Sequence, residues 1–215
     1  MVKLTIYVEG GVPDDPTDTV GNSAVFRENF HQLFIQKLPQ TTFDLAIHPI
    51  GQISQASNHL KKITDQKIDA VLLIDLDAPK TERKKRLADN YASDPSKVFF
   101  MIQEMEAWII SQPEKIEDYA RSTHLVFKRP EPISDNPLIK NRHPEEIKKP
   151  GERLNTLLGQ YFSVEKMRKG RLKKGPKSYA KSKDGPALIG LLQLEQLMLV
   201  FEDVQNLVGY IENIS

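Results

Sequence analysis

The chain has 215 residues, of which 39% are hydrophobic and 27% are charged, and its formal net charge is +1. This composition is typical of one globular domain with a substantial core, and the near-neutral charge excludes a polycationic protein. No apolar run is long enough to cross a bilayer, and no signal-peptide pattern precedes the first expected strand. The absence of cysteine excludes disulfides, thiolate metal sites and a cysteine nucleophile. We therefore expect a cytoplasmic protein with no membrane partner.

The first half of the chain alternates expected strands with expected helices. β-rich or continuously apolar stretches predict strands at residues 2–8, 42–50, 67–77 and 97–102. Helical spacing of apolar residues, or a charged helical pattern, predicts helices at about residues 22–38, 52–66, 80–91 and 104–113. This alternation predicts an α/β fold with a mostly parallel sheet and helices on both faces.

The second half of the chain has a different composition. Residues 113–184 are rich in Pro and Lys, which predicts a basic, irregular insertion with one or two short helices. Residues 185–215 carry two amphipathic helices, whose apolar faces we expect to pack on the core rather than on a partner. We expect a single domain over 1–215, with its βα core at 1–112.

Acidic residues stand at the carboxyl ends of two expected strands, where ligands bind in open α/β sheets. Glu9 follows the first strand, and Asp75 and Asp77 end the third. Because strand side chains alternate, Asp75 and Asp77 are expected to share one face and to repel each other unless a cation or water intervenes. Oxygen donors without His or Cys favour Mg²⁺ or Mn²⁺, and an ordinary surface turn is the alternative.

Further acidic residues and two glycines adjoin these strand ends. Glu104 and Glu106 follow the fourth strand, and in a helix only one of them would point into a site. Gly10 and Gly11 permit a sharp turn and a close approach to phosphate or metal, with a plain turn as the alternative. P-loop, GxSxG and strand-linked GxGxxG motifs are absent from the sequence.

The segment from Lys166 to Lys183 contains nine Lys or Arg residues and no acidic residue. Such a stripe is able to contact nucleic-acid phosphates, and a solvated loop is an equal alternative. The candidate contacts are Lys166, Arg168, Lys169, Arg171, Lys173, Lys174 and Lys177. Lys181 is a candidate for stabilising charge at the reacting phosphate, again beside the alternative of a solvated lysine.

Several motifs together resemble a known family. They are "YVEGG", "LLIDLDAP", "FFMIQEMEAWIISQP", "NRHPEEIKKPGERL" and "KSYAKSKDGPALI", which span residues 7 to about 190. The Glu-Gly and Asp-x-Asp pair resembles the Toprim fold of topoisomerases, primases and OLD-type nucleases. The whole set is more similar to the Toprim-like family labelled domain of unknown function 4276, and "EMEAW" is its most specific block.

The resemblance implies a role for each matching residue. Glu9 would be a general acid/base or metal ligand, Asp75 and Asp77 would bind the metal, and Glu104 would add a carboxylate. The acids of the loop after Glu9 offer an alternative to Glu104; they are Asp14, Asp15 and Asp18. Related proteins often work beside an ABC/AAA-type ATPase in bacterial anti-phage defence, which implies such a partner here.

These observations predict a Mg²⁺- or Mn²⁺-dependent nuclease that cleaves phosphodiester bonds of DNA or RNA. One or two metal ions would activate water and hold the phosphate, Glu9 would take the proton, and the basic stripe would hold the polyanion. A non-catalytic Toprim-like subunit of an ATPase partner is the alternative. A phosphate-ester hydrolase for small molecules is a third, which would not need the basic stripe.

Overall fold

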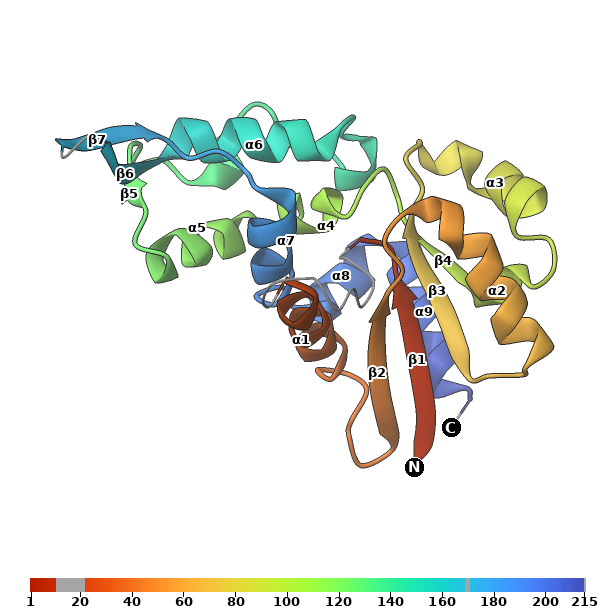
Figure 1. The fold of residues 1–215 in the computed structure, drawn as a ribbon. Helices are drawn as coiled ribbons and strands as arrows, with labels where there is room; N and C mark the ends of the chain where they lie inside the picture. Colours follow the sequence, from red (N-terminus) through yellow and green to blue (C-terminus); the bar gives the residue numbers. More distant parts are fainter. Residues whose placement is uncertain (11–21, 169–170, 215) are drawn as a thin grey trace.

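The structure, a computed structural model, describes residues 1–10, 22–168 and 171–214. A four-stranded parallel sheet with the order β2-β1-β3-β4 lies between helices, as Figure 1 shows. Its strands are β1 (Val2–Val8), β2 (Phe43–Pro49), β3 (Ala70–Asp75) and β4 (Val98–Met101). This arrangement confirms the α/β class and is consistent with a Toprim-like core.

Alternating strand residues divide the core into two layers, one on each face of the sheet. Leu4, Ile6 and Val8 of β1 belong to one apolar cluster, whereas Leu72 and Ile74 of β3 belong to the other. The first layer is covered by α1 (Asn22–Phe34), α8 (Leu194–Val200) and α9 (Glu202–Glu212). The second is covered by α2 (Ala56–Asp65) and α3 (Arg83–Asn90). All six residues of β3 are buried, as the apolar run predicts for a strand covered on both faces.

The segment between the sheet and the C-terminal helices contains more regular structure than its composition suggests. The helices are α4 (Glu106–Ile110), α5 (Pro113–Ser122), α6 (Pro150–Tyr161) and α7 (Lys181–Ile189). The strands are β5 (Val126–Phe127), β6 (Phe162–Arg168) and β7 (Arg171–Pro176), which form an antiparallel sheet. The sequence predicted one or two short helices within residues 113–184, where α5 and α6 lie, and it gave no strand signal because the strands contain Lys, Gly and Pro.

Proline and glycine mark where the observed helices differ from the expected ones. The helix expected at 104–113 stops earlier, because Pro113 opens a separate helix, α5, at a position where proline is favoured. The first of the two helices expected within residues 185–215 is divided into the end of α7 and the whole of α8, with Gly190 after α7. Within the described ranges, no helix is long and apolar enough to cross a membrane.

Candidate active site

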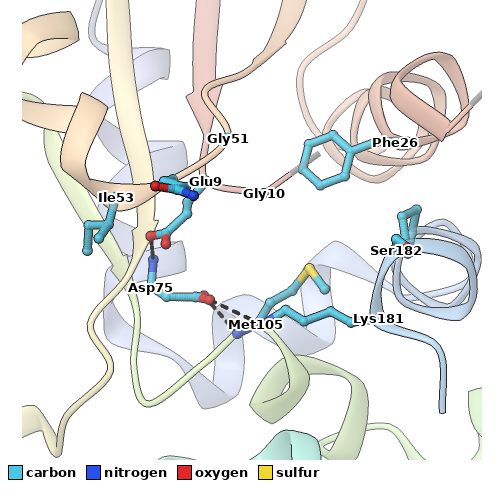
Figure 2. A pocket seen from close by; sticks show the side chains of 11 residues that line it. Glu9, Gly10, Phe26, Gly51, Ile53, Asp75, Met105, Lys181 and Ser182 are labelled. Atoms are coloured by element: carbon cyan, nitrogen blue, oxygen red, sulfur yellow. Dashed lines mark hydrogen bonds and ion pairs between the residues drawn. The ribbon is translucent and has the colours of Figure 1, made fainter. Parts of the chain in front are cut away.

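The carboxyl edge of the parallel sheet brings Glu9 and Asp75 together. β1 and β3 are parallel neighbours with Val8 opposite Leu73, so Glu9 is one residue away in register from Asp75, the last residue of β3. The backbone N–H of Asp75 donates a hydrogen bond of 3.0 Å to Oε2 of Glu9, as Figure 2 shows. The carboxylate of Glu9 and the backbone of Asp75, sixty-six positions apart in the sequence, are therefore held together by one direct hydrogen bond.

Asp75 is buried and has partners on both of its carboxylate oxygens. Its side chain accepts a 2.9 Å hydrogen bond from the backbone N–H of Met105 through Oδ1. Its other oxygen, Oδ2, lies 3.6 Å from Nζ of Lys181. The residue is only 7% exposed, so its charge depends on these partners rather than on bulk water.

Glu106 adds a third carboxylate, which is fully buried at the start of α4. Its Oε1 accepts a 2.9 Å hydrogen bond from the hydroxyl of Tyr179. Its Oε2 lies 3.3 Å from Nζ of Lys181 but accepts no hydrogen bond of good geometry. Lys181 therefore stands between Asp75 and Glu106, and one ammonium serves two buried carboxylates.

Burial of these carboxyl groups raises their proton affinity. Burial raises the pKa of Glu9 to about 7, helped by the charge of Asp77 and opposed by the Asp75 backbone N–H and by Lys181. Burial also raises the pKa of Asp75 well above its usual range, and Lys181 only partly offsets this effect. Burial alone would lower the pKa of Lys181, but the nearby carboxylates, Asp75 first and then Glu106, raise it overall. The site thus holds more acidic groups than one lysine neutralises.

Asp77 and Glu104 lie at the margin of this cluster. β3 ends at Asp75, and Asp77 has a positive φ of 52°, so the strand alternation behind the same-face expectation does not reach Asp77. Its side chain is exposed, and its charge contributes to the raised pKa of Glu9. Glu104 precedes α4 and accepts a 3.1 Å hydrogen bond from the backbone N–H of Gly151. Of the two EMEAW glutamates, Glu106 is therefore the one that contacts Lys181.

A cavity of about 710 Å³ opens beside these carboxylates. It is lined by Glu9, Gly10, Phe26, Gly51, Gln52, Ile53, Asp75, Met105, Lys181, Ser182 and Pro186. Gly10 has a φ of 102°, and a Cβ atom there would stand 3.3 Å from the ring of Phe26. The first glycine of "YVEGG" is thus required for the backbone turn and for the close approach of an aromatic ring.

Asp184 fixes the segment that delivers Tyr179 and Lys181 to the site. It is 1% exposed and accepts hydrogen bonds from the Tyr119 hydroxyl at 2.7 Å and the Ala180 backbone N–H at 2.8 Å. It also forms an ion pair with Lys177. Burial opposes ionisation of Asp184, but these bonds, that of Lys177 first, lower its pKa overall. Lys177 is consequently held at the base of α7.

The remaining basic candidates lie around the β6–β7 hairpin. Lys173 and Lys174 are exposed on β7. The backbone positions of Lys166, Arg168 and Arg171 lie in the same hairpin, whereas Lys169, Gly11 and the acids Asp14, Asp15 and Asp18 fall outside the described residues. Figure 1 shows that α6 leads from the sheet region to this hairpin. Because α6 has 12 residues, it spans about 18 Å between the Glu104 contact and the first residue of β6.

Sequence reasoning left open whether Glu104 or Glu106 points into the site and named Glu104 as the added carboxylate, and it did not select Tyr179 as a site residue. For Glu106 a signal was present, since it stands in a run of apolar residues where a buried carboxylate needs a partner. Tyr179 reaches Glu106 only because Gly185 has no side chain: a Cβ atom there would lie 2.8 Å from the Tyr179 hydroxyl. This contact between Tyr179 and Glu106 depends on how α7 packs against the rest of the protein, and no local sequence pattern predicts it.

The fold and site together define an α/β protein with an acidic cluster at the carboxyl edge of a parallel sheet. The chain belongs to the family described as Domain of unknown function (DUF4276), whose model matches residues 24–212. The matched region includes Asp75, Glu106 and Lys181, while Glu9 precedes it. No curated protein and no solved structure matches the chain.

Proposed function

We propose that this protein is a Mg²⁺-dependent nuclease that hydrolyses phosphodiester bonds of DNA or RNA. The observation that carries the proposal is the pairing of Asp75 and Glu106 with one lysine, with Glu9 bonded to the backbone of Asp75, beside a cavity at the carboxyl edge of the sheet. Ligands of open α/β sheets bind at this edge. Carboxylates with raised pKa values beside a cavity are candidates for catalysis.

The donor set of the site fits a hard divalent cation. Among the described residues, no three acidic or histidine side chains are grouped so as to hold a metal by themselves. Mg²⁺, however, is usually held by one or two carboxylates together with water and substrate phosphate. Asp75 would be the first of these ligands, and Oε2 of Glu106, which accepts no hydrogen bond, is a further oxygen donor, while Glu9 is kept as the base. Mn²⁺ would suit the same oxygens.

Each residue of the site has a distinct task in the proposed reaction. The metal, when bound, supplies charge neutralisation at the phosphoryl group. Glu9, with a pKa of about 7, is matched to accept a proton from the attacking water near neutral pH. Lys181 lies where its ammonium can contact a non-bridging phosphate oxygen. Tyr179 keeps Glu106 in place, since burial and the charge of Glu106 raise its pKa and keep its hydroxyl a donor.

The distance between the acidic cluster and the basic hairpin favours a polymeric substrate. The length of α6, about 18 Å, corresponds to roughly five base steps of a nucleic-acid strand at 3.4 Å per step. A small phosphate ester in the cavity would not reach Lys173 or Lys174. The two lysines are therefore contacts for the flanking strand, and a substrate that uses them must extend beyond the reacting phosphate.

The test is cleavage of single- and double-stranded DNA and RNA by purified protein with Mg²⁺, Mn²⁺ or EDTA. We expect metal-dependent cleavage that falls about 100-fold or more in Asp75→Asn and Glu9→Gln, the lower range for loss of acid–base chemistry. Asp44→Asn is the matched control, because Asp44 is exposed on β2 near the opposite end of the sheet. Equal activity in all variants would show that the cleavage comes from elsewhere.

The setting of the reaction belongs to the same proposal. The cysteine-free sequence is compatible with a reducing cytoplasm, and the family resemblance supports an ABC/AAA-type ATPase partner in anti-phage defence. Adding the candidate ATPase and ATP should increase cleavage by wild type and not by Asp75→Asn. If the ATPase forms a complex with wild type and with Asp75→Asn, and neither complex cuts nucleic acid, the protein is better described as a non-catalytic subunit.

A further inference from the structure

The two outer strands of the parallel sheet, β4 and β2, differ in how their free edges are covered. At β4, the outward N–H of Phe100 donates a 3.2 Å hydrogen bond to the buried side chain of Asp203 in the first turn of α9. β2 lies at the other side of the sheet, as Figure 1 shows, and within the described ranges β1 is its only strand partner. An open strand edge is a template for pairing with a further strand.

The outward backbone groups of β2 belong to its odd-numbered residues. In a parallel pair, alternate residues bond to the neighbouring strand, and the 2.9 Å bond from Ile50 N–H to the Val8 carbonyl assigns the even-numbered residues of this stretch to β1. Leu45 and Ile47 therefore point their N–H and C=O groups away from β1. No other part of the chain that the structure describes donates to these groups or accepts from them.

The ends of β2 carry fewer open groups than its centre. The Phe43 N–H already donates a 3.0 Å hydrogen bond to the carbonyl of Pro39, and Pro49 has no N–H. Leu45 and Ile47 are thus the residues that offer a free donor together with a free acceptor. A partner strand with the same two open residues would form four hydrogen bonds with them.

The exposed side chains of β2 fit a second copy of the same strand. Asp44, Ala46 and His48 lie on the face of β2 that turns away from α1, and all three are exposed. When two copies of β2 run antiparallel and cross at Ala46, the Asp44 side chain of each copy lies opposite His48 of the other. This pairing opposes an acidic side chain to a basic one twice, and only two methyl groups meet at the axis.

We infer that β2 forms an antiparallel pair with β2 of a second copy of this chain, across a two-fold axis at Ala46. Leu45 of each copy exchanges backbone hydrogen bonds with Ile47 of the other, so that all four bonds form. The two four-stranded sheets become one sheet of eight strands. Because the paired strands run in opposite directions, the two acidic clusters lie at opposite ends of this sheet. The dimer leaves both clusters open, and the inference does not depend on the proposed function.

Sedimentation of the purified protein over a range of concentrations tests the dimer. Wild type should form a species of twice the chain mass. Ala46→Lys should weaken dimerisation about tenfold or more, because two ammonium groups would oppose each other at the axis. Thr5→Lys is the matched control, since Thr5 is the register neighbour of Ala46 on β1, one strand further from the axis. A monomer at every concentration, or equal dimerisation of the two variants, would overturn the inference.

Disulfide formation tests the register of the pair, because the chain contains no cysteine of its own. At the axis, the two Cα atoms of residue 46 would stand about 4.5 Å apart, which is within the range that a disulfide spans. Ala46→Cys should therefore give a covalent dimer under mild oxidation. Asp44→Cys is the control on the same face of the same strand, because its two thiols would lie about 14 Å apart along the paired strands. Equal cross-linking of the two variants would contradict the register.

A charge exchange tests the opposition of Asp44 and His48. His48→Asp alone should weaken dimerisation a few-fold, because it places two carboxylates opposite each other at both ends of the pair. Adding Asp44→Lys to the same chain should restore the dimer, because each new lysine then faces a carboxylate. Failure of the second change to restore dimerisation would overturn the pair centred on Ala46.

Discussion

The carboxyl edge of the parallel sheet and the β6–β7 hairpin differ in how they are built. The edge collects side chains from β1, β3, α4 and α7, and its carboxylates are mostly buried. The hairpin is a local antiparallel pair whose described lysines, Lys173 and Lys174, are exposed. A change at the edge therefore acts through buried partners, whereas a change in the hairpin acts through screened charges in water.

The largest effect that we expect from the contrast between buried and exposed charges is at Asp184. Asp184→Ala should lower the free energy of unfolding by about 3 kcal/mol, because the ammonium of Lys177 loses its partner in a largely buried place. Urea denaturation measures the change. Asp135→Ala is the control: its ion pair with Lys140 is about half exposed on both sides, and it should cost at most about 1 kcal/mol. Similar losses in the two variants would contradict a buried structural role for Asp184.

A substitution at Gly185 tests whether the position of the Tyr179 side chain affects the cleavage rate. Gly185→Ala would place a methyl group 2.8 Å from the Tyr179 hydroxyl and 3.0 Å from Cε of Met105. The resulting displacement should lower the cleavage rate about 10- to 100-fold, as misplacement by about 1 Å does. Gly209→Ala in α9 is the control, because its added Cβ would meet nothing within 4 Å. Unchanged cleavage in Gly185→Ala would show that the Tyr179–Glu106 contact is dispensable.

Glu9 makes the stability of the edge depend on pH. Its folded pKa of about 7 lies above the unfolded value of 4.5, so the folded state binds the proton more tightly and loses stability as pH rises from 4.5 to 7. Glutamine does not ionise. In EDTA, Glu9→Gln should therefore match wild type near pH 4 and exceed it above pH 7 by about 1–2 kcal/mol, after discounting for solvent screening. Thermal unfolding across this range measures the difference, and a constant difference would contradict the raised pKa.

The hairpin should give the smallest and most salt-dependent effect. Lys173→Gln with Lys174→Gln should weaken oligonucleotide binding a few-fold and make the slope of log affinity against log salt shallower by about 1.4, or 0.7 per lost phosphate contact. The cleavage rate at saturating substrate should not change. Lys61→Gln with Lys62→Gln, on α2, is the matched control. A loss of saturated rate would place the hairpin nearer to the chemistry than α6 allows.

The central sheet was predictable from the sequence because its signals are local and its assembly follows general rules. β-rich and continuously apolar stretches locate β1 and β3, and right-handed βαβ connections bring their carboxyl ends to one edge. The meeting of Glu9 with Asp75 follows from those rules. The position of the Asp77 side chain does not follow from these rules, because the alternation of side chains ends with the strand and Asp77 itself has a positive φ.

The other half of the site depends on tertiary packing that no short segment encodes. Tyr179 and Lys181 reach the edge through Asp184, whose partner Tyr119 stands on a different helix. The roles of Gly10 and Gly185 are visible only when Phe26 and Tyr179 are in place. A sequence pattern shows that a glycine is present, whereas the structure shows which atom occupies the space beside it.

The ammonium of Lys181 between Asp75 and Glu106 means that the protein carries its own counterion. Two buried carboxylates would otherwise repel each other in the unliganded fold. Under the proposed function, an arriving cation would compete with this internal one, and each carboxylate that it took over would release the lysine ammonium. The Lys181 ammonium would then be free to contact a substrate phosphate instead of the two carboxylates.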